Sequence, residues 1–181
     1  MGNTKKHRQP QRKSSGWLPA AAVVLAAAVA VTVFTRAGDS GRESASGSAA
    51  AESQTVSEGG SLVIPLSELS AAARFYPVEV DGTEMEIIAV EDAAGSIRTA
   101  FNTCQVCYSS GRGYYVQDGG DLVCQNCGNH FTVDQVEIES GGCNPWPIFP
   151  ENKTVTDESI SISYDYLHEA TQIFANWKAV S

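Results

Sequence analysis

The chain has 181 residues, of which 43% are hydrophobic and 8% aromatic, so it is long enough for one modest folded domain with additional segments. Its formal net charge is −9, and half of its 12 basic residues precede residue 37 whereas all 21 acidic residues follow it. An acidic domain repels the phosphates of nucleic acids and anionic lipid surfaces, which excludes nucleic acid as a partner of the folded part.

The amino-terminal part predicts a membrane anchor. Residues 1–17 form a basic tail, and residues 18–35 contain the uncharged run LPAAAVVLAAAVAVTVF. As a helix this run rises about 26 Å, which approaches the ~30 Å hydrocarbon core of a bilayer once flanking residues are included. The run is longer than the apolar part of most signal peptides and no clear A-x-A site follows it closely, so we expect an uncleaved anchor, with a cleaved signal peptide as the alternative.

The distribution of charge around this segment predicts its orientation. Basic residues precede it and acidic residues follow it, which favours a single-pass protein of the cell membrane with a cytoplasmic amino terminus and the main domain outside. Residues 36–60 are rich in Gly, Ser, Ala and Glu without apolar periodicity, so we expect a flexible linker there. Residues 61–181 then form an extracytoplasmic domain.

The first half of this domain predicts antiparallel strands. We expect a short strand over residues 61–66, ending near a proline, and a helical turn over residues 67–73. Asp81-Gly82 is a strong hairpin signal, and it predicts paired strands over residues 74–80 and 83–90. A further strand, residues 96–101, leads directly into the first cysteine.

The second half predicts another hairpin and a final helix. The hairpin has strands at residues 113–117 and 122–124 around a turn at 118–121. Alternating residues predict a late strand at 159–163, and residues 164–177 have the periodicity of a helix. One more strand is expected from the apolar residues Phe131, Val133, Val136 and Ile138.

These elements predict a mainly β (α+β) fold. We expect a small antiparallel sheet domain with a four-cysteine metal-binding hairpin and a C-terminal helix, behind one N-terminal transmembrane helix.

All five cysteines lie in one segment, and their spacing predicts a metal site. Cys104/Cys107 and Cys124/Cys127 form two C-x-x-C pairs separated by sixteen residues, which is typical of a four-thiolate site. A C-x-x-C turn points two sulfurs to one side, and two such turns facing each other close a tetrahedron. Zinc fits this geometry, and iron and iron-sulfur clusters also take four cysteines.

Two other chemistries remain open for these thiols. Cysteines outside the cytoplasm are commonly oxidised to disulfides, and a C-x-x-C pair can cycle between dithiol and disulfide. A covalently attached haem is excluded at both pairs, because Tyr108 and Gly128 occupy the positions where the haem-binding His would stand.

Cys143 has no C-x-x-C partner. It lies between Gly141-Gly142 and Asn144-Pro145-Trp146-Pro147, a stiff turn that would hold its sulfur in a defined direction. We expect a fifth ligand, an exchange partner or a reactive thiol, and a buried structural thiol is the alternative.

Other polar residues near the cysteines receive secondary roles. His130 is expected at the surface, because four sulfurs already complete a shell. The acidic excess is interpreted first as a solvated face; the alternative is that it attracts cations such as ferrous iron, for which Asp134, Glu137 and Glu139 are the best candidates. No catalytic residue is predicted, so a non-enzymatic metal or electron-transfer protein is favoured over an enzyme.

The cysteine motifs resemble those of a known family. The run IRTAFNTCQVCY (97–108), the Gly113-Tyr114 step, the run VCQNCG (123–128) and the run GGCNP (141–145) together are similar to the membrane iron-sulfur protein, FtrD-like family, over roughly residues 62–177. The resemblance implies an iron-sulfur centre and electron transfer near the membrane, in association with bacterial iron transport. It implies the ligands Cys104, Cys107, Cys124, Cys127 and Cys143.

The resemblance also implies partners, namely iron-transport or redox membrane proteins. Longer members have a polytopic membrane portion, whereas this chain has one predicted membrane segment, so a partner would have to supply any electron path across the membrane.

The route of export bears on the metal. Iron-sulfur centres are usually built in the cytoplasm, so their carriers cross the membrane already folded, through the twin-arginine route. The leader has Lys5-Lys6 and no Arg-Arg pair, so it lacks the signal for that route. We therefore expect an iron-sulfur cluster or iron, with zinc as the alternative. The leading function is electron transfer or metal handling associated with iron uptake, and the rivals are a structural zinc-ribbon interaction module and a thiol-disulfide oxidoreductase.

Overall fold

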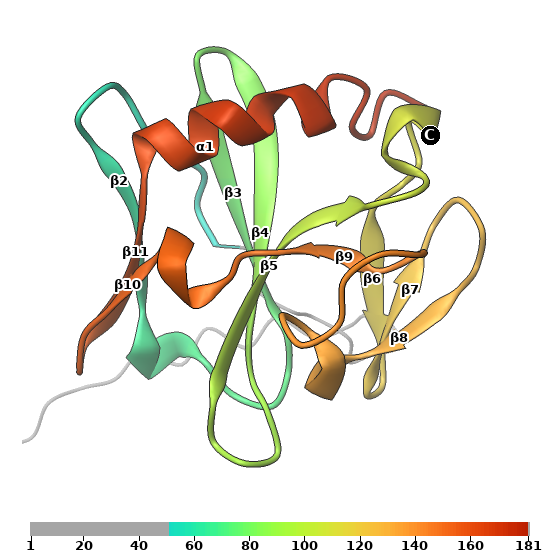
Figure 1. Ribbon diagram of the computed structural model, residues 1–181, viewed down its shortest axis with the longest axis horizontal. Coiled ribbons are helices and arrows are strands. Elements are labelled where there is room, and N and C mark those ends of the chain that lie inside the picture. The colour runs from blue at the N-terminus through green and yellow to red at the C-terminus, as the bar shows by residue number, and fades with distance from the viewer. Residues whose placement is uncertain (1–50, 181) are drawn as a thin grey trace, which may run out of the picture. The chain divides into compact units, whose positions relative to one another are not determined.

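The computed structural model describes residues 51–180 (Figure 1). The predicted basic tail, the predicted membrane anchor and residues 36–50 of the predicted linker lie outside the described residues. Within residues 51–180, no helix combines the length and the apolar character needed to cross a bilayer. The described part is mainly β with one short C-terminal α-helix, as predicted for the domain.

A five-stranded sheet forms the centre of the fold, in the order β1-β3-β4-β5-β9. Neighbouring strands of this sheet run antiparallel, except that β1 runs parallel to β3. The predicted hairpin is confirmed, because β3 and β4 pair around Asp81 and Gly82, whose φ values of 50° and 77° are those of a type I′ turn. The strands are β1 (Gln54–Thr55), β3 (Arg74–Val80), β4 (Thr83–Glu91), β5 (Ile97–Cys104) and β9 (Pro145–Pro147).

Strand β1 lies in the segment predicted as linker. Gln54 and Thr55 pair with Val78 and Glu79, and Val56 directly after them is buried. A two-residue strand that pairs through its backbone leaves no apolar alternation in the sequence. The folded domain therefore includes residues before position 61.

A second sheet packs with the first to form the main core. It has the order β10-β11-β2 and lies on the left of the central strands in Figure 1. Its strands are β2 (Ser61–Pro65), β10 (Thr154–Val155) and β11 (Ser159–Ser163). The core between the sheets contains Leu62, Ile64, Tyr76, Val78, Met85, Ile87, Phe101, Ile160 and Ile162, all buried.

The C-terminal helix closes this core. Helix α1 (Tyr164–Ala170) begins at the N-cap Ser163, whose hydroxyl accepts a hydrogen bond from the N–H of Tyr166. The helix predicted over residues 164–177 is shorter in the structure. Helix α1 ends at Ala170, and the chain continues as the 3-10 helix η5 (Thr171–Phe174). Leu167, Ala170 and Phe174 of the predicted apolar face are buried in the core.

A third, smaller sheet lies on the right of Figure 1, in the order β6-β7-β8. The predicted hairpin is confirmed by β6 (Tyr115–Asp118) and β7 (Asp121–Cys124). The prediction of a strand that extends to Ile138 is wrong. Strand β8 (His130–Thr132) ends at Thr132, and the chain turns there into η3 (Val133–Gln135). Three further 3-10 turns are η1 (Leu66–Glu68), η2 (Tyr108–Ser110) and η4 (Pro150–Asn152).

A second hydrophobic cluster joins the small sheet to the central one. Ile88 and Ala100 from β4 and β5 pack in the same cluster as Leu122 and Phe131 from β7 and β8. Buried cysteines belong to this cluster as well. The cysteine site is thus built at the junction of two sheets.

Candidate metal centre

The first C-x-x-C turn begins at the end of β5. Cys104 is the last residue of that strand and is fully buried, and Cys107 is buried in the turn after it. The N–H of Cys107 lies 3.4 Å from the Cys104 sulfur. A Cβ atom on Gly113 would lie 2.3 Å from the carbonyl oxygen of Cys107, so the returning chain can pass only as glycine.

The second C-x-x-C turn follows β7. Cys124 is the last residue of that strand, is buried and pairs with Tyr115 of β6. The N–H of Gly128 donates to the carbonyl of Cys124 at 2.8 Å, and Gly128 has the positive φ of 71° that this turn requires. Cys127, just before the glycine, is exposed.

The third contributor is the loop that carries Cys143. This loop leads into β9, which pairs with β5 so that Pro145 lies opposite Cys104. Gln105 holds the loop from inside the first turn. Its N–H donates to the carbonyl of Asn144 at 3.1 Å, its amide nitrogen donates to the carbonyl of Pro145 at 3.2 Å, and its amide oxygen accepts from the N–H of Gly141 at 2.9 Å.

The three segments bring all five cysteines together. The sulfurs of Cys104, Cys107, Cys124 and Cys143, here called the four-sulfur group, all lie within 4.8 Å of one another. Cys104 and Cys143 are 3.2 Å apart, sulfur to sulfur. The sulfur of Cys127 lies outside this group but 2.9 Å from that of Cys143.

The four-sulfur group differs in one member from the set that the spacing suggests. The two C-x-x-C turns face each other, and Cys143 joins three of their sulfurs in the group, while Cys127 hydrogen-bonds to Cys143, Cys124 and Cys107. The reason is the pairing of β9 with β5, a contact between distant segments. All five residues are free thiols.

The dimensions and chemistry of the group fit a metal. A single ion bound to four thiolates at about 2.3 Å holds its sulfurs roughly 3.8 Å apart, because they stand at the corners of a tetrahedron. The separations in the four-sulfur group, 3.2 Å between Cys104 and Cys143 and at most 4.8 Å overall, bracket this value. Iron-sulfur clusters are likewise held by four cysteine thiolates.

Burial and hydrogen bonds divide the thiols by acidity. Burial raises the pKa of Cys107, of Cys143, and of Cys124, the last to about 12. Burial acts on Cys104 too, but hydrogen bonds from the Tyr115 hydroxyl and from backbone N–H groups outweigh it and lower the pKa of Cys104. The hydrogen bond with Cys143 lowers the pKa of Cys127 to about 7. Three thiols therefore resist ionisation until a cation replaces their protons.

Tyr115 is a further residue of the site. Its side chain is buried, and its hydroxyl lies 4.0 Å from the Cys143 sulfur. Asn102 fixes its backbone, accepting from its N–H at 2.7 Å and donating to its carbonyl at 3.2 Å. Burial raises the pKa of Tyr115, so the phenol stays protonated and can donate to sulfur. The sequence gives no signal for this role beyond an aromatic residue in a predicted hairpin.

The polar residues near the cysteines mostly serve other purposes. His130 is exposed and lies 3.0 Å from a carboxylate oxygen of Asp121. Glu137 is buried, so it does not face solvent as an attractor of cations. Its carboxylate accepts from the N–H of Thr99 at 2.8 Å and forms a buried ion pair with Lys153.

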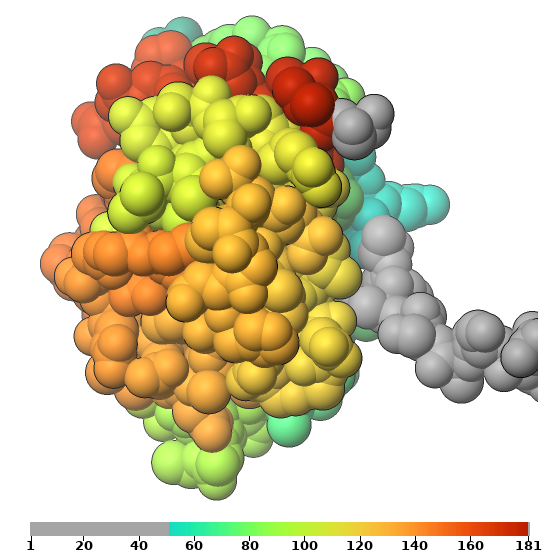
Figure 2. All heavy atoms as spheres, turned by 90° about the vertical axis from the view of Figure 1, so that its right-hand side faces the viewer, coloured from blue at the N-terminus to red at the C-terminus, as the bar shows by residue number. Residues whose placement is uncertain are grey.

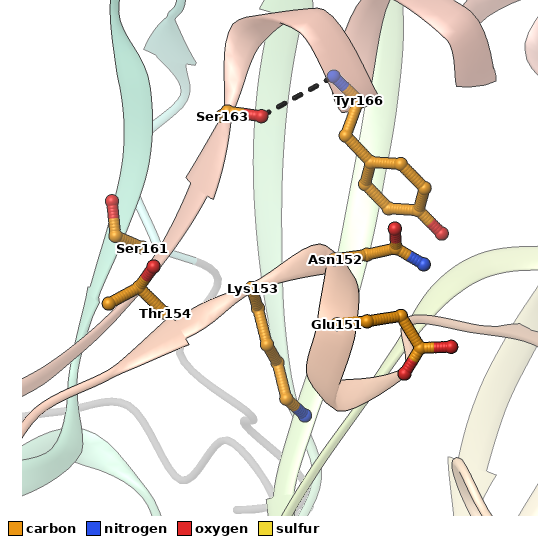
Figure 3. Close-up of a pocket in the computed structure, with 7 residues that line it drawn as sticks. All are labelled: Glu151, Asn152, Lys153, Thr154, Ser161, Ser163 and Tyr166. Carbon is orange, nitrogen blue, oxygen red and sulfur yellow. Dashed lines mark hydrogen bonds between the residues drawn. The ribbon is translucent and has the colours of Figure 1, made fainter.

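The cysteine segments are at the surface of one face. Figure 2 shows that residues coloured yellow to orange, from the small sheet and its neighbouring loops, make up much of this face. By contrast, a pocket of about 200 Å³ on the other side of the central sheet is lined by polar residues of η4, β10, β11 and α1 and contains no cysteine (Figure 3).

The comparisons with known proteins identify the family. A family model described as "Membrane iron-sulfur containing protein FtrD-like" matches residues 69–174, a span that covers more than half of the chain and includes all five cysteines. No curated protein and no solved structure matches the chain. The chain belongs to the FtrD-like family of membrane iron-sulfur containing proteins.

Proposed function

We propose that the cysteine site holds iron, as a single ion or as an iron-sulfur cluster, and that the protein transfers electrons or handles metal in support of iron uptake. The observation that carries this proposal is the four-sulfur group, whose sulfurs lie within 4.8 Å of one another in a member of a membrane iron-sulfur family. Thiolates are the ligands of iron in both forms.

The ligands would be drawn from the five converging cysteines. Cys104, Cys107 and Cys124 are buried, and Cys143 completes a set of four with them. Cys127, the exposed thiol, hydrogen-bonds to Cys143, Cys124 and Cys107 and would be a fifth ligand. When bound, iron would supply a one-electron redox step, and the chain's own residues would exclude water from the buried sulfurs.

The setting of this function would be the cell surface. Residues 18–35 would anchor the protein by a single pass, with the amino terminus in the cytoplasm and the domain outside; the charges on the two sides of the segment support this. The family description supports a membrane location. The partners would be iron-transport or redox proteins of the same membrane.

A structural zinc site is the second candidate. It is favoured by the size of the four-sulfur group, which suits one tetrahedral ion, and by the two C-x-x-C turns that contribute to it, one of which follows a strand of the small three-stranded sheet. In that case the domain would be an interaction module without redox chemistry. A thiol-disulfide oxidoreductase is the third, favoured by the 2.9 Å between the sulfurs of Cys127 and Cys143.

Metal analysis of the protein from cells separates the three. The full chain is purified in detergent without oxygen, and its visible spectrum, iron, zinc, acid-labile sulfide and free thiols are measured. We expect iron with a coloured spectrum; sulfide in addition identifies a cluster. Stoichiometric zinc without colour supports the structural site. Protein without metal, whose thiols titrate in pairs, supports the oxidoreductase and overturns the proposal.

A further inference from the structure

The C-terminal tail, residues 175–180, packs against the first C-x-x-C turn. Figure 1 shows the C-terminal end of the chain beside the turn that follows β5. The side-chain amide of Asn176 donates to the carbonyl of Ser109 in η2 at 3.3 Å. A Cβ atom on Gly111 would lie 3.0 Å from a side-chain carbon of Val180. The tail therefore covers the turn from outside.

Two further contacts fix the tail to the central sheet. The indole N–H of Trp177 donates to the carbonyl of Asn102 at 2.7 Å, and the ammonium of Lys178 lies 2.9 Å from the carboxylate of Glu86. The side chain of Glu86 is only 9% exposed, so its charge depends on this partner. Lys178 has a φ of 52°, which a non-glycine residue rarely adopts and which persists where surrounding contacts impose it.

These contacts converge on Asn102, which holds Tyr115. The Asn102 side chain is buried, and its amide nitrogen donates to the Glu86 carboxylate at 3.3 Å and to the Tyr115 carbonyl at 3.2 Å. Its amide oxygen accepts from the N–H of Tyr115 at 2.7 Å. The Tyr115 hydroxyl in turn hydrogen-bonds to the sulfur of Cys104. A continuous series of contacts thus connects Lys178 at the surface with a buried sulfur of the four-sulfur group.

The tail is the part of this arrangement that is able to move. Its residues are exposed except for the partly buried Trp177, whereas Ile173 and Phe174 just before it are buried in the main core. A terminal segment with few buried apolar contacts opens at a small free-energy cost. The tail can therefore leave its contacts while η5 stays packed in the core.

We propose that docking of the C-terminal tail and metal binding by the four-sulfur group are coupled: the docked tail holds the first C-x-x-C turn and Tyr115 in the arrangement that binds an ion, and undocking favours release of the ion. This inference rests on the proposed function, that the site binds metal. Trp177 and Lys178 are then positioning residues, which act through Asn102 and Tyr115 and not as ligands.

The coupling is reciprocal. If docking strengthens metal binding by some factor, the bound ion must stabilise the docked tail by the same factor. The backbone N–H groups of Trp177 and Ala179 bond to the carbonyls of Phe174 and Asn176 at 2.9 and 3.1 Å, so their exchange with deuterium reports on the order of the tail. A tail that only adds stability to the fold would not respond to the ion in this way.

The first measurement is metal affinity. Metal-free full-length protein in detergent is titrated with cobalt(II) in competition with a chelator, and the sulfur-to-cobalt charge-transfer band reports the bound thiolates. Lys178→Met removes the partner of Glu86, and Trp177→Phe removes the indole N–H while leaving the ion pair. Arg98→Met is the matched control, because Arg98 pairs with the buried Asp92 at the same 2.9 Å but near the opposite end of β5 from the cysteine site.

We expect Lys178→Met and Trp177→Phe each to weaken cobalt(II) binding about tenfold, as for other residues that orient a ligand, with an unchanged number of bound thiolates. Arg98→Met should lose stability to urea but keep its affinity for cobalt(II). Trp177→Phe carries the test if Lys178→Met does not fold.

The second measurement is hydrogen exchange of the tail with and without cobalt(II). Loading should slow exchange in residues 175–180 about tenfold in the unaltered protein and much less in Lys178→Met. The inference is overturned if Trp177→Phe binds cobalt(II) as tightly as the unaltered protein, if Arg98→Met weakens binding equally, or if loading leaves exchange of the tail unchanged. Failure of the unaltered protein to bind cobalt(II) would instead contradict the proposed metal site.

Discussion

The hydroxyl of Tyr115 lies 4.0 Å from the sulfur of Cys143, the least buried member of the four-sulfur group, and it also hydrogen-bonds to the sulfur of Cys104. A hydrogen bond to a ligand sulfur stabilises the more negative, reduced state of an iron centre and so raises its reduction potential. In an iron-loaded site Tyr115 would therefore position a ligand sulfur and help to set the reduction potential.

Tyr115→Phe should lower the reduction potential of the iron-loaded protein without abolishing metal binding. Loss of one such bond is worth about 1 kcal/mol, or roughly 40 mV for a one-electron couple. A redox titration measures the change. Tyr114→Phe is the matched control, because Tyr114 is the preceding residue and is only partly buried. Equal potentials for the two variants would show that the Tyr115 hydroxyl has no part in the site.

Gln105→Ala should weaken metal binding about 10–100-fold, the usual effect of removing a residue that orients a ligand. Gln105 supplies two side-chain hydrogen bonds to the loop of Cys143. Competition with a chelator of known affinity measures the loss. Gln125→Ala alters the corresponding residue of the other turn. Within residues 51–180 its side-chain amide donates to the nearby carbonyl of Val123 and to no residue of the Cys143 loop, so the change should have little effect. Similar losses in both variants would mean that the loop is held by other contacts.

Lys153→Met should destabilise the fold by about 3–5 kcal/mol, because it leaves the buried carboxylate of Glu137 without its cation. The side chains of both residues are almost fully buried, at 3% and 4% exposure. Urea unfolding measures the change, and adding Glu137→Gln should recover part of it. The exposed pair of His130 and Asp121 is the control, and His130→Ala should cost less than about 1 kcal/mol. An equally small effect of Lys153→Met would contradict the role of the buried pair.

The metal-free protein should lose stability as the pH rises above about 9. Burial raises the pKa of Cys124 from 9.0 to about 12, so the thiol ionises in the unfolded chain before it ionises in the folded one. The unfolded state then binds fewer protons, and the free energy of unfolding falls with pH by up to about 1.4 kcal/mol per unit for this group. The contribution is fully present below pH 9 and is lost between pH 9 and 12.

Urea unfolding at a series of pH values measures this slope. Tyr76, whose pKa burial also raises to about 12, adds to the loss only above its ordinary value of 10.0, so the interval from pH 9 to 10 isolates the thiols. Cys124→Ala should reduce the slope there. An unchanged slope in that variant would remove Cys124 as its source.

The parts of the fold that the sequence predicts are those with local signals. Asp81-Gly82 and the turn at residues 118–121 identify two hairpins correctly, because their conformations are set by the turn residues themselves. The spacing of the C-x-x-C pairs likewise predicts that the two turns face each other. Each of these features depends on residues that are close along the chain.

The parts that the sequence does not predict depend on distant partners. Cys143 joins the four-sulfur group because β9 pairs with β5, and a three-residue strand of Pro145, Trp146 and Pro147 gives no strand signal. Glu137 is an ordinary acidic residue in the sequence, and its burial follows from Lys153, sixteen residues later. The exposure that distinguishes Cys127 from Cys124 is also invisible in the C-x-x-C pattern.

The position of the cysteines at the ends of strands from two sheets has a mechanical consequence. Cys104 ends a strand of the central sheet and Cys124 ends a strand of the small one. A shared ion would cross-link these sheets much as a disulfide would, and its removal by a chelator should free the small sheet to fluctuate. Amide hydrogens of β6, β7 and β8 should then exchange with deuterium faster, while those of β3 and β4 keep their protection.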